Sequence, residues 1–325
     1  MPSQNALTTQ ISESTMLYST HSLKDLITAI KERKVILFVG GGVSMNLGLP
    51  SWDSLIDKLA RDLGYETEHF RGLADRLMLA EYYQMNKGIG SLRSWMDRKW
   101  HNMDNVNIRE SRIHQLIVEL NFPIIYTTNY DRWIEFAFDA YDRDYIKIAD
   151  VTDLKNIEEG TTQIIKYHGD FDHDDSIVLT ETSYFERLDF ETPLDLKLRA
   201  DVLGRSILFI GYSISDINIR YLLYKLNRMW ERATKQGAKP KSFILLMKPN
   251  PVLEQVLENR GITTLISTYE DPKKGLTDFL EVLYNETRED SPLTSGKVSG
   301  PDAPESWTSP SEDESGAKNH DGFVL

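Results

Sequence analysis

The chain has 325 residues, of which 40% are apolar and 27% charged, as in ordinary globular proteins. Its formal net charge of −13 argues against a general nucleic-acid binder, because affinity for the phosphate backbone depends on clustered Lys and Arg. The sequence contains no cysteine, which excludes disulfides, thiolate nucleophiles and cysteine-bound zinc within this chain.

The first 20 residues are polar and lack periodicity, which predicts a flexible N-terminal segment. They lack the basic region and apolar core of a secretory signal. No apolar run in the sequence approaches the roughly 18 to 20 residues that a membrane span needs. We therefore expect a cytoplasmic protein.

Short apolar runs alternate with segments of helical periodicity along most of the chain. The predicted strands are 35–39, 123–127, 164–167, 177–179, 207–210, 243–247 and 263–266. The predicted helices are about 22–33, 52–63, 131–141, 215–233, 251–259 and 273–286. Ser22 and Asp25 suggest a capping box for the first helix, and Ser51 an N-cap for the second. This alternation predicts an α/β fold with a doubly wound, Rossmann-like parallel sheet.

Two segments depart from this alternation. Residues 66–120 have a helical pattern throughout, which predicts a helical insertion. Its predicted core residues are Leu77, Met78, Leu79, Tyr82, Tyr83, Trp95, Trp100, Leu116 and Ile117. Residues 288–325 are dominated by Ser, Pro, Gly, Glu and Asp, which predicts a disordered acidic tail. The sequence thus predicts one domain over residues 21–287.

Four polar motifs follow predicted strands. They are Gly40-Gly41-Gly42-Val43-Ser44, Thr127-Thr128-Asn129-Tyr130-Asp131, His168-Gly169 and Gly211-Tyr212-Ser213. Ligands of open α/β sheets bind in the crevice at the carboxyl ends of the strands. We therefore expect all four motifs to meet at one crevice.

The chemistry of these motifs suits a nucleotide, although each has a simpler explanation. Successive glycines let the backbone approach a phosphate, and the Ser213 hydroxyl suits a phosphate or a ribose. The glycines match neither the dinucleotide fingerprint nor the P-loop, and a plain turn is the alternative. Asn129 could instead form an Asx-turn, Asp131 an N-cap and His168 a hydrogen-bonded core residue. The acidic run at 172–175 favours a solvated loop over a metal site.

Taken together, the motifs resemble the sirtuin family. Sirtuins carry Gly-Ala-Gly-x-Ser, Gly-x-Pro, Thr-Gln-Asn-x-Asp, His-Gly and Gly-Thr-Ser in this order. The chain has the corresponding segments in the same order, at 40–44, 48–50, 127–131, 168–169 and 211–213. The resemblance covers roughly residues 30 to 270.

The departures from the sirtuin pattern indicate a particular branch. The four zinc-binding cysteines are missing, and Ser51-Trp52-Asp53 replaces the usual Asp-Phe-Arg. Gly41 replaces Ala, and Tyr130 replaces an aliphatic residue near the nicotinamide pocket. These differences favour the divergent, zinc-less bacterial proteins that hydrolyse NAD in anti-phage defence.

The resemblance implies a NAD glycohydrolase that cleaves NAD to nicotinamide and ADP-ribose, with NAD as substrate and no zinc. It implies that Asn129 and His168 are catalytic, with His168 as a general base of ordinary pKa, about 6.5. The implied NAD-binding residues are Gly40, Gly41, Gly42, Ser44, Pro50, Asp131, Gly211 and Ser213. Two alternatives stay open: a NAD-dependent deacylase or ADP-ribosyltransferase, and a non-catalytic subunit that senses NAD or ADP-ribose in a defence complex.

A free NAD hydrolase would be toxic to its own cell, so the resemblance also implies restraint. The restraint would come from a homo-oligomer, or from a HerA-type ATPase or other defence sensor in trans. The aromatic helices of residues 66–120 are the candidate oligomer surface. We expect neither a membrane partner nor direct nucleic-acid binding.

Overall fold

The computed structural model describes residues 20–101, 106–173, 176–189, 191–212, 217–233 and 240–288. Nearly all of the predicted flexible N-terminal segment, the acidic tail beyond Arg288, and Ser213 lie outside these residues. Among the helices within them, none is both long and apolar enough to cross a bilayer.

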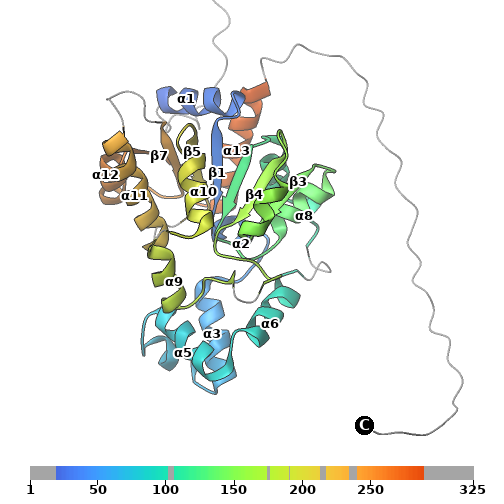
Figure 1. Cartoon of the computed structure of the whole chain (residues 1–325), viewed down its shortest axis with the longest axis vertical. Helices are drawn as coiled ribbons and strands as arrows, with labels where there is room; N and C mark the ends of the chain where they lie inside the picture. Colours follow the sequence, from blue (N-terminus) through green and yellow to red (C-terminus); the bar gives the residue numbers. More distant parts are fainter. Residues whose placement is uncertain are drawn as a thin grey trace, which may run out of the picture. The chain divides into compact units, whose positions relative to one another are not determined.

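A seven-stranded sheet forms the centre of the fold, and all of its strands are parallel. Its order is β3-β4-β2-β1-β5-β6-β7. The strands are β1 (Val35–Val39), β2 (Ile124–Thr127), β3 (Tyr145–Ile148), β4 (Thr162–Lys166), β5 (Ser206–Ile210), β6 (Ser242–Leu246) and β7 (Ile262–Ile266). The chain runs to one side of β1 with β2 to β4 and to the other side with β5 to β7 (Figure 1). This arrangement confirms the predicted doubly wound sheet.

Helices cover both faces of the sheet because the strands are apolar on both. Leu37, Val39 and Ile125 belong to a core that includes α1 (Thr20–Lys31), α7 (Arg112–Glu119), α8 (Trp133–Ala140) and α13 (Pro272–Arg288). Phe38 and Tyr126, the alternate strand residues, belong to a second core with α10 (Pro193–Asp201), α11 (Ile217–Ala233) and α12 (Pro251–Asn259).

A separate helical layer lies beyond the carboxyl ends of the strands (Figure 1). It consists of α3 (Trp52–Leu63), α4 (Thr67–Arg71), α5 (Arg76–Lys87) and α6 (Gly90–Trp100). Its apolar side chains form a third core, which takes in Tyr130, Phe171 and Leu179 from the strand-end loops. The helical layer is therefore packed directly against the loops that carry the predicted site.

Most of the expected core of residues 66–120 is found, with three exceptions on α5, of which Leu77 is half-buried and belongs to none of the three cores. Leu79 and Tyr83 are buried, whereas Met78 is 46% exposed and Tyr82 40% exposed. Residues one apart in a helix point in different directions, so only one face of α5 reaches the third core. The prediction that Met78 and Tyr82 are core residues is wrong.

Several expected elements differ in detail. Gly41–Met45 forms a short helix, α2, where we expected a loop. Residues 177–179 are irregular backbone rather than a strand, and the Val178 N–H donates to the His168 carbonyl (3.0 Å). Ser22 and Asp25 lie inside α1, which begins at Thr20, so they form no capping box there.

Besides α2, one strand and two α-helices of the described chain have no counterpart in the sequence prediction. They are the edge strand β3 and the helices α9 (Glu181–Leu188) and α10. Only Ile148 of β3 is buried, and the polar Lys147 interrupts the apolar run, so the strand lacks the pattern of a buried one. Thr180 and Thr192 begin α9 and α10 with capping boxes, which is a sequence signal that could have identified both helices.

Candidate nucleotide site

A cavity of about 1410 Å³ lies at the carboxyl ends of the strands. It is lined by the loops after β1, β2, β4, β5 and β6 and by residues of α3 and α5. Among the predicted site residues it is lined by Gly41, Gly42, Ser44, Pro50, Asn129, Asp131, His168 and Gly211. Gly40 does not line the cavity, and Ser213 lies outside the described residues.

The loops after β1 and β5 cross at Gly40 and Gly211. The Gly40 N–H donates to Ile210 O, and the Gly42 N–H donates to Gly211 O, both at 2.9 Å. A Cβ on Gly40 would lie 2.6 Å from Gly211 O, and Gly211 has a φ of 71°, which favours glycine. Gly40 therefore packs against Gly211 behind the cavity, while Gly41 and Gly42 line it.

Gly40 and Gly41, two of the three consecutive glycines, should respond differently to alanine. We expect Gly40→Ala to lower the free energy of unfolding by about 1–3 kcal/mol, because its Cβ would overlap Gly211 O and Tyr212 Cγ. The matched control is Gly41→Ala, whose Cβ would meet no atom closer than the Asn129 Oδ1 at 4.0 Å. Urea unfolding followed by circular dichroism measures both variants. Equal losses of unfolding free energy in the two variants would show that the contact with Gly211 does not limit the size of the residue at position 40.

Asn129 joins the loops after β1 and β2. Its Nδ2 donates to Ser44 Oγ at 3.0 Å and to Gly40 O at 3.2 Å. The turn at Asn129 is made instead by Thr127, whose Oγ1 accepts the Asn129 N–H (3.0 Å). The Asn129 side chain therefore does not form an Asx-turn. It connects the ends of two strands by hydrogen bonds.

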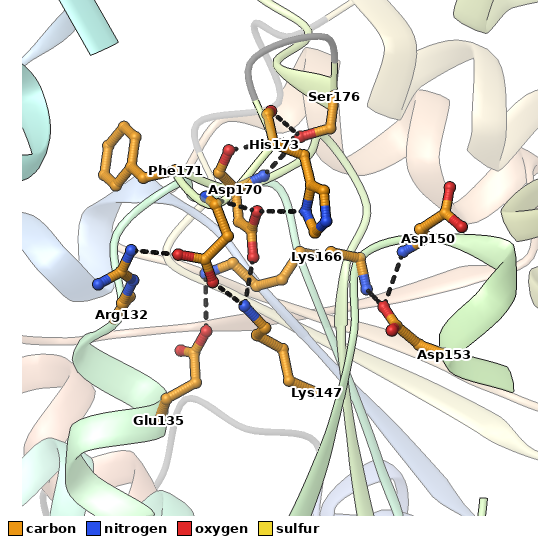
Figure 2. Close-up of polar contacts among 12 residues, drawn as sticks. Arg132, Glu135, Lys147, Asp150, Asp153, Lys166, Asp170, Phe171, His173 and Ser176 are labelled. Carbon is orange, nitrogen blue, oxygen red and sulfur yellow. Dashed lines mark hydrogen bonds and ion pairs between the residues drawn. The ribbon is translucent and has the colours of Figure 1, made fainter. Parts of the chain in front are cut away.

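Asp131 is fixed by contacts to both its side chain and its backbone. Its Oδ1 accepts the Trp133 N–H (3.2 Å) at the start of α8, but the N-cap of α8 is Arg132, so the N-cap alternative for Asp131 is wrong. Its carbonyl accepts a hydrogen bond from Lys166 Nζ. Lys166 is fully buried and lies 3.2 Å from the Glu135 carboxylate (Figure 2). The buried Lys166–Glu135 pair therefore fixes the backbone of the 129–131 segment through the carbonyl of Asp131.

His168 is almost completely buried, with 1% of its surface exposed. Its ring stacks on Tyr167 and meets the edge of Tyr184 from α9 at 5.5 Å between centroids. Burial, helped by the charge of Arg187, lowers the pKa of His168 to about 3. The prediction of an ordinary pKa is wrong, because α9 and its tyrosine remove the ring from water. His168 is neutral at physiological pH.

The loop after His168 is held by glycine and by ion pairs. Gly169 has a φ of 83°, and a Cβ there would lie 2.1 Å from Ser176 O. Asp170 is buried and accepts from Lys147 Nζ (2.6 Å) (Figure 2). Burial alone would raise the pKa of Asp170, but the hydrogen bond and charge of Lys147 lower it below its usual value. Asp172 also pairs with Lys147 and with Arg132 (2.5 Å).

Asp170 and Asp172 are thus paired with cations rather than gathered as a ligand set, and Asp174 and Asp175 lie outside the described residues. Within the described part of the chain, no group of three or more His, Asp or Glu residues is placed to hold a metal ion.

Tyr212 is a site residue that the sequence did not identify. Its hydroxyl donates to Val39 O at 3.0 Å and lies 3.0 Å from Thr128 Oγ1. It therefore ties the end of β1 to the loop after β2 and lines the cavity. A tyrosine after a strand has no distinctive local pattern, so only the spatial neighbours show its role.

Comparisons with known proteins agree with these features. Residues 123–265, which include Asn129, His168 and Gly211, match the family described as SIR2-like domain. This confirms the resemblance to sirtuins. The chain is 29% identical over 217 residues to "NAD(+) hydrolase ThsA" of Bacillus cereus (strain MSX-D12), covering 65% of this chain and 43% of that protein. It is 27% identical over 249 residues to "Defense-associated sirtuin 2" of Bacillus subtilis, covering 74% of this chain and 24% of that protein.

The chain spans less than half the length of these two relatives. A crystal structure of a Sir2 homologue in complex with NAD has a TM-score of 0.45 and 13% identity, covering 82% of this chain and 93% of that one.

Proposed function

From this SIR2-like domain we propose that the protein is a NAD glycohydrolase, which cleaves NAD to nicotinamide and ADP-ribose. The observation that carries the proposal is the meeting of the predicted motifs at one cavity, with Asn129 and His168 on the same side of the β1–β5 crossing. The relatives named NAD(+) hydrolase ThsA support this activity, and the relative named defence-associated sirtuin supports a role in anti-phage defence.

The dinucleotide would lie across the crossing of the loops after β1 and β5, where the strand order reverses. The backbone of Gly41 and Gly42 then approaches the pyrophosphate closely, with the Ser44 hydroxyl beside it. The nicotinamide riboside would lie on the β2 and β4 side, against Asn129, Asp131 and His168. Because the Asn129 Nδ2 is used within the protein, its Oδ1 is the atom offered to the ribose hydroxyls or to water.

The reaction breaks the bond between the nicotinamide nitrogen and C1′ of the ribose. The bonding pair goes to the cationic pyridinium nitrogen, so neutral nicotinamide leaves without needing a proton. The ribose passes through an oxocarbenium-like state, as in glycoside hydrolysis. Water attacks C1′ and loses a proton, which neutral His168 accepts. A positioned base contributes about 10²- to 10⁴-fold in rate when its pKa lies near the working pH, and the lowered pKa makes His168 of the free protein a weaker base than an ordinary histidine.

The cytoplasm, which holds the NAD pool, would be the place of action. A homo-oligomer, or a defence sensor such as a HerA-type ATPase, would restrain the activity in uninfected cells. The exposed Met78 and Tyr82 of α5 make the helical layer the surface that we would test first for such assembly.

Mass spectrometry of NAD incubated with the purified full chain tests the activity. We expect NAD to disappear with nicotinamide and ADP-ribose formed in equal amounts. Intact NAD, both alone and with the candidate partner, would count against hydrolysis. ADP-ribose binding without turnover would then support the sensing alternative, and O-acyl-ADP-ribose formed from an acyl-lysine peptide would support the deacylase.

A further inference from the structure

The charges that line the cavity are distributed unevenly. The carboxylates among its described lining residues are Asp53 of α3, Asp75 at the start of α5 and Asp131 in the loop after β2. On that side the lining cations are paired, because Arg76 contacts Asp53 (2.8 Å) and Arg71 contacts Asp57. The opposite side is formed by α11, β6 and the N-terminal ends of α12 and α13, and its charges differ.

The β6 side of the cavity has cations and no carboxylate among its described lining residues. Lys248 follows β6, and Arg220 lies near the start of α11. Both side chains are exposed, and neither makes a hydrogen bond or an ion pair with another described residue. The remaining described residues on this side are apolar apart from Asn250.

Two described carboxylates that neighbour lining residues in the sequence already accept backbone N–H groups. Glu254 Oε1 accepts the Asn250 N–H (2.7 Å) and Asp271 Oδ1 accepts the Lys273 N–H (3.0 Å), and neither residue lines the cavity. Asn250 is the N-cap of α12, whose positive N-terminal end therefore lies directly after Lys248. The described residues on this side therefore favour an anion.

This argument rests on the proposed function, which places the nicotinamide riboside on the β2 and β4 side. The adenosine must then lie on the β5 and β6 side. In dinucleotide folds, an Asp or Glu that binds the ribose 2′-hydroxyl selects NAD, whereas a cation near the same position accommodates the 2′-phosphate of NADP. We propose that Lys248 and Arg220 bind the 2′-phosphate of NADP, so that the enzyme cleaves NADP as well as NAD.

Kinetics with both dinucleotides test the proposal. We expect the full chain to cleave NADP with a kcat/KM no more than about tenfold below that for NAD. The double variant Lys248→Gln with Arg220→Gln should lose about 10- to 100-fold in kcat/KM for NADP, because charge-assisted hydrogen bonds to phosphate are lost. Its kcat/KM for NAD should change less than threefold by the same reasoning.

The matched control is Lys274→Gln, a nearby exposed lysine that lies over Tyr269 and does not line the cavity. It should leave both substrates unchanged. A binding readout that does not depend on turnover is competition between 2′,5′-ADP and 5′-AMP. The full chain should prefer the 2′-phosphorylated nucleotide, and the double variant should not.

The outcomes separate this proposal from the glycohydrolase itself. Efficient NAD cleavage with NADP more than about 100-fold worse, or equal losses for both substrates in the double variant, would overturn the roles of Lys248 and Arg220 while leaving NAD hydrolysis in place. Failure to cleave either dinucleotide overturns the proposed function, and the nucleotide competition then still decides whether the cations bind a 2′-phosphate.

Discussion

Asn129→Ala should reduce kcat/KM for NAD cleavage by at least about 100-fold. The substitution removes the Oδ1 that faces the cavity beside Gly41, and it also removes the Nδ2 that links Ser44 and Gly40. Without Oδ1, the ribose hydroxyls or the attacking water lose a hydrogen-bond acceptor. Without Nδ2, the loop after β1 is free to move away from the loop after β2. The loss of both contacts in one substitution explains why we expect a large effect.

Controls separate these two effects. Ser44→Ala removes one of the two acceptors of Nδ2 and keeps Oδ1, so we expect a smaller loss than in Asn129→Ala. Asn86→Ala removes an exposed amide that donates only locally, to Tyr82 O, and should leave activity unchanged. NAD turnover by mass spectrometry and unfolding by circular dichroism measure all three. A folded Asn129→Ala protein with full activity would remove Asn129 from the mechanism.

The sequence was sufficient to predict the centre of the sheet. The strands β1, β2 and β5 are buried on both faces, and their apolar runs of β-branched and aromatic residues are hard to mistake. The edge strand β3 could not be predicted, because its pattern is set by what packs against one face. In the same way, the glycine segment gave no sign of α2, since glycine disfavours helices and only the crossing with Gly211 fixes its conformation.

The position of the site could be predicted, but the environment of its residues could not. A strand end is visible in the sequence, and parallel strands bring their ends to one edge. In contrast, His168 is buried against Tyr184 on α9. The sequence of α9 contains no apolar run, so its position over His168 could not be predicted. The different roles of Gly40 and Gly41 likewise depend on the backbone of Gly211, more than 160 residues away in the sequence.

The lowered pKa of His168 gives a distinct expectation for the pH dependence of catalysis. The pH profile of kcat/KM reports the pKa of an essential base in the free enzyme. With a pKa of about 3, His168 remains unprotonated between pH 8 and pH 5, so protonation of this base should cause no loss of kcat/KM in that range. An ordinary histidine would instead lose about tenfold per pH unit below its pKa of about 6.5.

The lowered pKa of His168 also makes the stability of the folded chain depend on pH. The unfolded chain binds a proton at His168 near pH 6.5, whereas the folded chain resists it down to about pH 3. This contribution to stability is therefore fully present above pH 6.5 and is lost as the pH falls toward 3. Circular dichroism at each pH is needed so that unfolding in acid is not read as titration of the base.

Replacing the base tests its role directly. We expect His168→Ala to lose about 10²- to 10⁴-fold in kcat/KM, while His173→Ala, a change of the exposed histidine in the same loop, should have little effect. An inflection near pH 6.5 in the unmodified protein that disappears in His168→Ala would mean that His168 is exposed to water before catalysis. In that case Tyr184 and α9 must move aside when the dinucleotide binds, and burial of His168 would describe only the free protein.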